Sequence, residues 1–117
     1  MELWHESGDG QRRLLATEVH VADGLLAQAR GRMFTRRFPE GSALVFPFDG
    51  VAKRSIHMVA VPYSLDVIWL IEEKVVAVKQ LSPMVGFGRA SADAVIELPA
   101  GVAEEVAPGD RVVTTES

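Results

Sequence analysis

Short apolar stretches separated by turn-forming residues dominate the hydrophobic pattern of this chain. In some stretches apolar and polar residues alternate with a period of two, and in others, such as "LDVIWLI" at residues 65–71, the apolar run is almost continuous. The first pattern is typical of half-buried β-strands and the second of strands buried on both faces. The expected strands are residues 2–6, 12–21, 43–48, 54–61, 65–71, 74–81, 93–99 and 111–116.

Turn signals define the connections between these strands. "SGDG" at residues 7–10 and the pair Glu72-Glu73 are expected to close hairpins. Pro47 is expected to end a strand, and residues 82–92 to form a loop.

One segment, residues 23–34, carries apolar side chains at helical spacing, with Asp23 as its N-cap. Gly31 weakens this helix by about 1 kcal/mol relative to Ala. A helical turn is also expected at residues 101–106. Many short strands with one short helix predict a mainly β protein, a single-domain β-sandwich or small barrel over residues 1–117. The residues expected in its core are Leu65, Val67, Trp69, Ile96, Leu98, Val45, Met58 and Val76.

Composition and charge narrow the classes of function. The chain has 117 residues, 48% hydrophobic and 24% charged, as in an ordinary globular domain. A net charge of −4 argues against nucleic acid as a partner, and the lack of cysteine excludes thiol catalysis and cysteine-ligated zinc. Asp66 breaks the longest apolar run, so we expect no membrane span and no membrane partner. Charges throughout residues 1–20 differ from a signal peptide, and we expect a cytoplasmic protein.

A series of motifs runs through the chain in a fixed order. The motifs are Ala29-Arg30-Gly31-Arg32-Met33-Phe34 with Arg36, His57-Met58, Pro62 with Leu65-Asp66-Val67-Ile68, Glu97-Leu98-Pro99-Ala100-Gly101, and Gly109-Asp110. With these motifs the chain closely resembles the family catalogued as domain of unknown function 192, and the resemblance covers roughly residues 14–114. The resemblance implies a mostly β domain of sandwich type and no established biochemical activity. Members often carry Trp at the position of His57, so a shared metal-binding role for this residue is not implied.

Asp66 and Glu97 are carboxylates placed within apolar strands. A buried carboxylate without a partner shifts its pKa or destabilises the fold, so each is expected to have one. We predict that Asp66 is ionised, at least half buried, and held by an arginine of residues 30–37, Arg36 or Arg30, which would clamp the helix to the sheet. Backbone N–H groups are the alternative partners.

Two functional interpretations stay open beside this structural one. In the first, the protein is a non-enzymatic binding or interaction module for an unknown small ligand or protein, with a small polar pocket formed by Asp66, His57, Arg36, Arg30 and Glu97. In the second, Asp66 and Glu97 are the acid and base of a small hydrolase-like or sugar-acting enzyme. We favour the first interpretation.

Other motifs carry weaker signals. His5, His20 and His57 lack the spacing of a metal site, so we expect no metal, and nothing indicates a cofactor. "GFGR" at residues 86–89 resembles half of a phosphate loop, but no strand and helix flank it, which favours a plain loop. Residues 30–37 hold four Arg and could attract an anion. Candidates for an apolar docking patch, although core packing is commoner for such residues, are Met33, Phe34, Met84 and Phe87.

Overall fold

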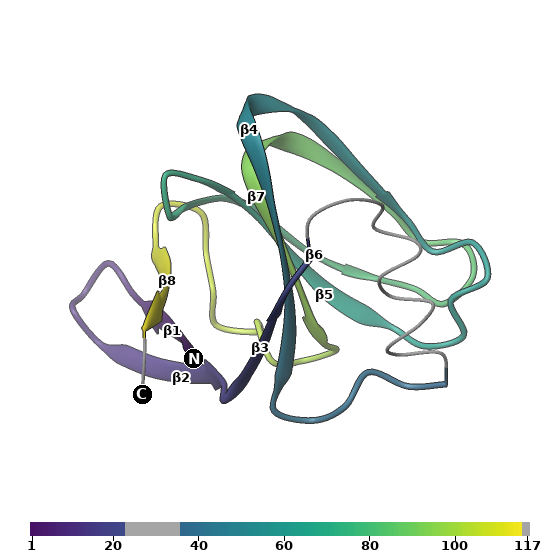
Figure 1. Ribbon diagram of the computed structural model, residues 1–117, viewed down its shortest axis with the longest axis horizontal. Helices are drawn as coiled ribbons and strands as arrows, with labels where there is room; N and C mark the ends of the chain where they lie inside the picture. Colours follow the sequence, from purple (N-terminus) through teal and green to yellow (C-terminus); the bar gives the residue numbers. More distant parts are fainter. Residues whose placement is uncertain (23–35, 116–117) are drawn as a thin grey trace.

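The structure is a computed structural model that describes residues 1–22 and 36–115. The described residues contain β-strands and no helix, which confirms a mainly β protein, while the helix expected at residues 23–34 lies outside them (Figure 1). Within the described part, no helix has the length and apolar character to cross a bilayer. The strands are β1 (Glu2–Glu6), β2 (Arg12–Ala16), β3 (Glu18–Val21), β4 (Ser42–His57), β5 (Leu65–Ile71), β6 (Lys74–Leu81), β7 (Phe87–Pro99) and β8 (Arg111–Thr115).

The eight strands form one sheet in the order β2-β1-β8-β6-β5-β7-β4-β3. The pairs are antiparallel except β3 with β4, which is parallel. Thr17 alone connects the two edge strands, β2 and β3, so the sheet must curl until its edges meet at this residue (Figure 1). Whether the fold is a sandwich or a barrel stays a prediction, because the strands form one open sheet with a hydrophobic core on each face.

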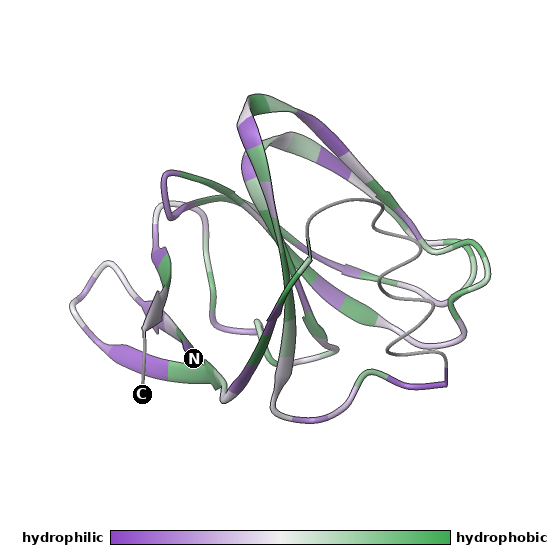
Figure 2. Cartoon of the chain, viewed as in Figure 1, coloured by the Kyte–Doolittle hydropathy of each residue, from purple (hydrophilic) through white to green (hydrophobic). Residues whose placement is uncertain are grey.

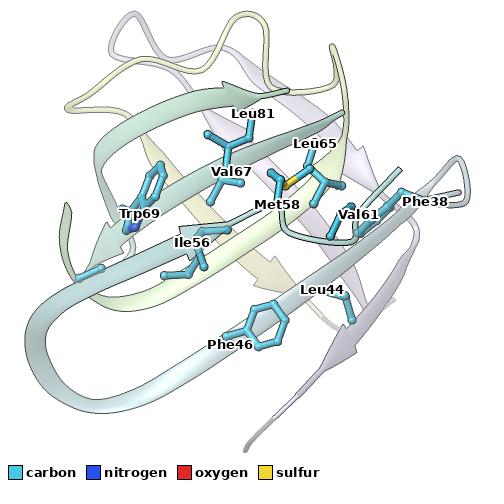
Figure 3. Close-up of a cluster of buried hydrophobic side chains, with 12 residues drawn as sticks. Phe38, Leu44, Phe46, Ile56, Met58, Val61, Leu65, Val67, Trp69 and Leu81 are labelled. Atoms are coloured by element: carbon cyan, nitrogen blue, oxygen red, sulfur yellow. The ribbon is translucent and has the colours of Figure 1, made fainter. Parts of the chain in front are cut away.

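The central strand β5 separates the two hydrophobic cores. Alternation along the strand sends every second side chain to the same face. The first core, drawn in Figure 3, consists of Phe38, Leu44, Phe46, Ile56, Met58, Val61, Leu65, Val67, Trp69, Leu81, Ala92 and Val95. The second core, on the other face, consists of Leu3, Leu15, Ala16, Ala43, Ile68, Leu70, Val75, Ile96, Leu98, Ala103, Val106 and Val112.

Most of the predicted core residues are buried, with one error that has a structural cause. Val45 is partly buried against the second core. Val76 is 38% exposed, so its prediction is wrong. A β-bulge explains this, because Trp69 faces Ala77 and Leu70 faces Val75, which leaves Val76 as the extra residue. The predictions confirmed as buried are Leu65, Val67, Trp69, Ile96, Leu98 and Met58.

The two predicted hairpins are confirmed. β1 and β2 pair across residues 7–10, and β5 and β6 pair across Glu72 and Glu73. The φ angles of 49° at Glu72 and 69° at Glu73 are those of a tight two-residue turn.

β4 and β7 are longer than the sequence predicts. β4 continues through Pro47, because the ladder to β7 is interrupted between Pro47 and Ala52, where a residue without an N–H is tolerated. β7 begins at Phe87, inside the predicted loop. A Cβ at Gly88 would lie 2.5 Å from Cη2 of Trp69, so this glycine lets the indole ring pack against β7. Gly88 of "GFGR" therefore has a packing role.

Candidate functional site

Asp66 is almost fully buried, 4% exposed, on the face of β5 that carries the second core. Its Oδ1 accepts a hydrogen bond from Nε2 of Gln80 at 3.1 Å. Its Oδ2 accepts two bonds, from the backbone N–H of Gly101 at 2.9 Å and of Ala103 at 2.8 Å. Both carboxylate oxygens are thus occupied, and Asp66 fixes the start of the connection between β7 and β8, residues 100–110, hereafter the 100–110 loop.

The local conformation of the 100–110 loop presents these N–H groups to Asp66. Gly101 has a φ of +94°, a conformation that favours glycine, and it reverses the chain just after β7. The segment predicted as a helical turn is a run of turns, in which Glu104 N–H bonds to Gly101 O at 3.2 Å and Val106 N–H to Ala103 O at 3.0 Å. Ala103 and Val106 are buried in the second core, so this half of the loop is held by packing as well.

The prediction that Arg36 holds Asp66 is wrong. Arg36 is exposed and is not among the residues that bond to the carboxylate, while Arg30 lies outside the described residues. The burial of Asp66 is confirmed, and the backbone N–H groups left open as an alternative are two of its partners. A nearby main chain satisfies the carboxylate without ordering a long arginine side chain.

Glu97 and Asp66 lie on opposite faces of the sheet. Glu97 is opposite Val67 of β5 and Leu44 of β4, two residues of the first core, whereas Asp66 points into the second. Glu97 is 0% exposed. The sheet between them prevents these carboxylates from meeting at one substrate, as an acid and base would have to.

His57 is not part of a pocket with Asp66 either. It is exposed at the last position of β4, opposite Phe87, where β7 begins. Asp66 is opposite Leu98, near the other end of β7. Of the five residues predicted to form the pocket, the structure places Asp66 in one, puts Glu97, His57 and Arg36 elsewhere, and does not describe Arg30.

An open pocket of about 520 Å³ lies over Asp66, between β6 and the 100–110 loop. The pocket is lined on the β6 side by three consecutive residues, Val78, Lys79 and Gln80. Because consecutive side chains of a strand point to opposite faces, these three residues line the pocket together through the backbone edge of the strand. The side chain of Lys79 lies on the opposite face, where its Nζ donates to Phe87 O at 2.7 Å. We call this pocket the β6 groove; the loop residues that line it are Gly101, Ala103, Glu104, Val106, Ala107 and Pro108.

Within residues 1–22 and 36–115, the edge of β6 along this groove has backbone groups that no strand pairs with. β6 pairs with β8 only at Lys74 opposite Arg111. Val75 directs its backbone outward, since its N–H bonds to Asp110 O at 2.8 Å and its C=O accepts from Gly109 N–H at 2.9 Å. Alternation along β5 then places Val78 and Gln80 at positions whose N–H and C=O also point away from β5. No strand of the described residues pairs with these groups.

A second aspartate holds the far end of the 100–110 loop. Asp110 Oδ2 lies 2.8 Å from Nε2 of His5, which is 3% exposed, and accepts the Ala107 N–H at 3.0 Å. Its Oδ1 accepts the Gly8 N–H at 3.1 Å. The hydrogen bond with His5, supported by those backbone N–H groups and opposed by burial, lowers the pKa of Asp110. The loop is therefore fixed at both ends by carboxylates.

Sequence reasoning missed Gln80 and the 100–110 loop as parts of the site. A two-residue hairpin at Glu72-Glu73 without a bulge would put Lys79 opposite Asp66, and only the bulge at Val76 brings Gln80 there. Within the described residues, no group of three or more His, Cys, Asp and Glu side chains is placed to hold a metal ion.

Comparisons with known proteins agree with this architecture. The profile of the family DUF192, described as "Uncharacterized ACR", matches residues 6–114. A crystal structure from Sinorhizobium meliloti 1021, of a protein with a suggested role in transcription regulation, is 19% identical, with a TM-score of 0.78 over 96% of this chain and 91% of that one. A protein of unknown function from Novosphingobium aromaticivorans DSM 12444 is 20% identical, with a TM-score of 0.74 over 97% and 84% of the two chains. At these identities the likeness shows the fold alone. A search of the curated proteins finds no match.

Proposed function

The chain belongs to the uncharacterised DUF192 family, which supplies no activity, and we propose from the geometry of the site that it is a non-enzymatic binding module for a short extended peptide segment. The observation that carries this proposal is the β6 groove, an open pocket of about 520 Å³ along a strand edge that pairs with no other strand of the described residues at Val78 and Gln80. An extended peptide that adds to a sheet edge gains backbone hydrogen bonds and side-chain pockets together.

The wall and floor of the groove suit such a ligand. Val78 and Gln80 each offer an outward N–H and C=O, two residues apart, which is the spacing that an added strand pairs with. Val106 and Pro108 give the opposite wall an apolar surface, and Glu104 adds a charge at the rim. Asp66 takes no ligand atom in this proposal, because its hydrogen bonds hold the loop that forms the wall.

The enzymatic alternative has no supporting observation. Asp66 has both oxygens engaged, and Glu97 lies on the other face of the sheet, so these two carboxylates do not converge on one substrate. The functional role left to Asp66 is to position the loop.

Nuclear magnetic resonance titration with a defined probe tests the proposal. The probe is acetyl-Thr-Val-Thr-Val-amide, and its control is the same peptide N-methylated at every residue, which lacks the donors a strand needs. The unmethylated peptide should change the amide chemical shifts of Val78, Gln80 and the 100–110 loop, and the methylated peptide should leave them unchanged.

A matched pair of variants sharpens this test. Ala107→Trp should fill the β6 groove and abolish the shifts, because Ala107 is exposed and lines it. Ala100→Trp should leave them unchanged, because Ala100 is also exposed on the loop but does not line the groove. Binding that survives Ala107→Trp, or that the methylated peptide reproduces, would refute the proposal.

A further inference from the structure

Two adjacent loops expose a cluster of large apolar side chains away from the β6 groove. The loops are residues 58–64, after β4, and residues 82–86, after β6. Val59 is 69% exposed, Val85 82%, Met84 51% and the neighbouring Phe87 52%. We call these four residues the apolar tip. Figure 2 shows the two loops side by side as a mainly hydrophobic end of the molecule.

Backbone hydrogen bonds hold the apolar tip in shape. Met58 N–H bonds to Gly86 O at 3.0 Å, and Met84 N–H bonds to Val61 O at 2.9 Å. A Cβ at Gly86 would lie 2.6 Å from the backbone N of Ser82, so only glycine permits this close turn. Met58 and Val61 anchor their loop in the first core. The exposed side chains are therefore presented on a fixed scaffold.

The chain around the apolar tip is cationic. Residues 50–64 and 75–92 contain Lys53, Arg54, Lys79 and Arg89 and no Asp or Glu, in a chain whose net charge is −4. The β4–β7 register places Lys53, opposite Ser91, and Arg89, opposite Ser55, on the same face as the His57–Phe87 pair. Lys79 lies beside Phe87, to whose carbonyl oxygen it donates. Basic side chains on β4, β6 and β7 thus flank the apolar tip.

We propose that the apolar tip and its basic flank dock onto an anionic lipid surface. Both loops lie at one end of the longest axis of the molecule (Figure 1). Apolar side chains at the extremity with Lys and Arg behind them match the boundary between acyl chains and anionic headgroups. The expectation of no membrane partner rested on the lack of a spanning segment, and a surface contact needs none.

Co-sedimentation with vesicles of defined composition tests this docking. The whole chain should sediment with vesicles of phosphatidylglycerol and phosphatidylcholine in equal parts, and much less with pure phosphatidylcholine. Each basic residue near an anionic membrane contributes about 1 kcal/mol, or roughly fivefold in partitioning. Lys53→Gln with Arg89→Gln should therefore weaken binding by about 25-fold, and added salt should weaken it too.

Variants of the apolar side chains separate lipid docking from general attraction to anions. Val85→Ser with Phe87→Ser should reduce vesicle binding at least tenfold, while Val21→Ser, which changes a 54% exposed valine on β3, should not. Circular dichroism checks that every variant is folded. The proposal is overturned if the parent protein does not bind the mixed vesicles, or if the Val85/Phe87 variant binds them as the parent does. The proposal is also overturned, in favour of an acidic protein partner, if the parent protein and the Val85/Phe87 variant bind soluble polyglutamate equally well and as tightly as the parent binds the vesicles.

Discussion

Replacing Asp66 with alanine should release the first half of the 100–110 loop from the sheet. The change removes the acceptor of three hydrogen bonds, from Gln80, Gly101 and Ala103. A buried donor left without an acceptor costs about 1–3 kcal/mol. Water can reach the Gly101 N–H through the open β6 groove, whereas the Ala103 bond is buried. We therefore expect Asp66→Ala to lower the free energy of unfolding by about 2–4 kcal/mol.

Asp66→Asn distinguishes this arrangement from a clamp by an arginine. The asparagine carbonyl oxygen can still accept the Gly101 and Ala103 bonds, and its amide can face the oxygen of a turned Gln80 side chain. The expected cost is about 1 kcal/mol. An arginine partner would instead be left without its counter-charge, and Asn would then cost nearly as much as Ala.

Urea unfolding measures these differences, and amide hydrogen exchange locates them. Exchange at Gly101 and Ala103 should accelerate in Asp66→Ala well before global unfolding. Asp49→Ala, which changes an exposed aspartate of β4, should stay within about 0.5 kcal/mol of the parent. A loss below about 0.5 kcal/mol for Asp66→Ala, or unchanged exchange at both amides, would refute the anchoring role.

Three further predictions concern the rest of the fold. Gly88→Ala should cost about 1–3 kcal/mol and perturb the fluorescence of Trp69, because the added Cβ would lie 2.5 Å from the indole ring; an unchanged melting temperature and spectrum would contradict this. Leu98→Ala should cost about 2–4 kcal/mol in urea unfolding, because Leu98 is fully buried, and a loss below about 0.5 kcal/mol would mean that its face is wrongly assigned. Asp110 has a pKa below its ordinary value of 3.8, so its stabilising effect is present above that value and is lost as the pH falls through the folded-state pKa. The difference in urea midpoint between the parent and Asp110→Asn should thus shrink below about pH 4, and a difference that grows there would have the wrong sign.

The β5–β6 hairpin shows how far sequence reasoning reaches in this fold. Its two strands are found at their predicted limits, because a continuous apolar run, a turn pair and a second run rich in valine are all local signals. The bulge at Val76 has no such signal, since either neighbouring register keeps apolar residues inward at that point. One inserted residue changes which side chain faces Asp66, so the sequence did not predict Gln80 as its partner.

The hydrogen-bond partners of Asp66 show how much of the candidate site the sequence can predict. Burial of a carboxylate in an apolar strand follows from the residues beside it, and it is confirmed. Which group bonds to it depends on the path of the 100–110 loop, and backbone N–H groups have no signature in the sequence. The sequence predicts only a helical turn at residues 101–106, and such a prediction does not say where the N–H groups point.

Amide hydrogen exchange along β6 in the free protein is the most direct test of the binding-groove account. Lys79 lies opposite Val67, at a position whose N–H bonds to β5, while Val78 and Gln80 direct theirs into the groove. We expect fast exchange at Val78 and Gln80, slow exchange at Lys79 between them, and slower exchange at Val78 and Gln80 when acetyl-Thr-Val-Thr-Val-amide binds. Exchange at Val78 and Gln80 as slow as at Lys79 in the free protein would mean that the edge is already paired, which would contradict the account.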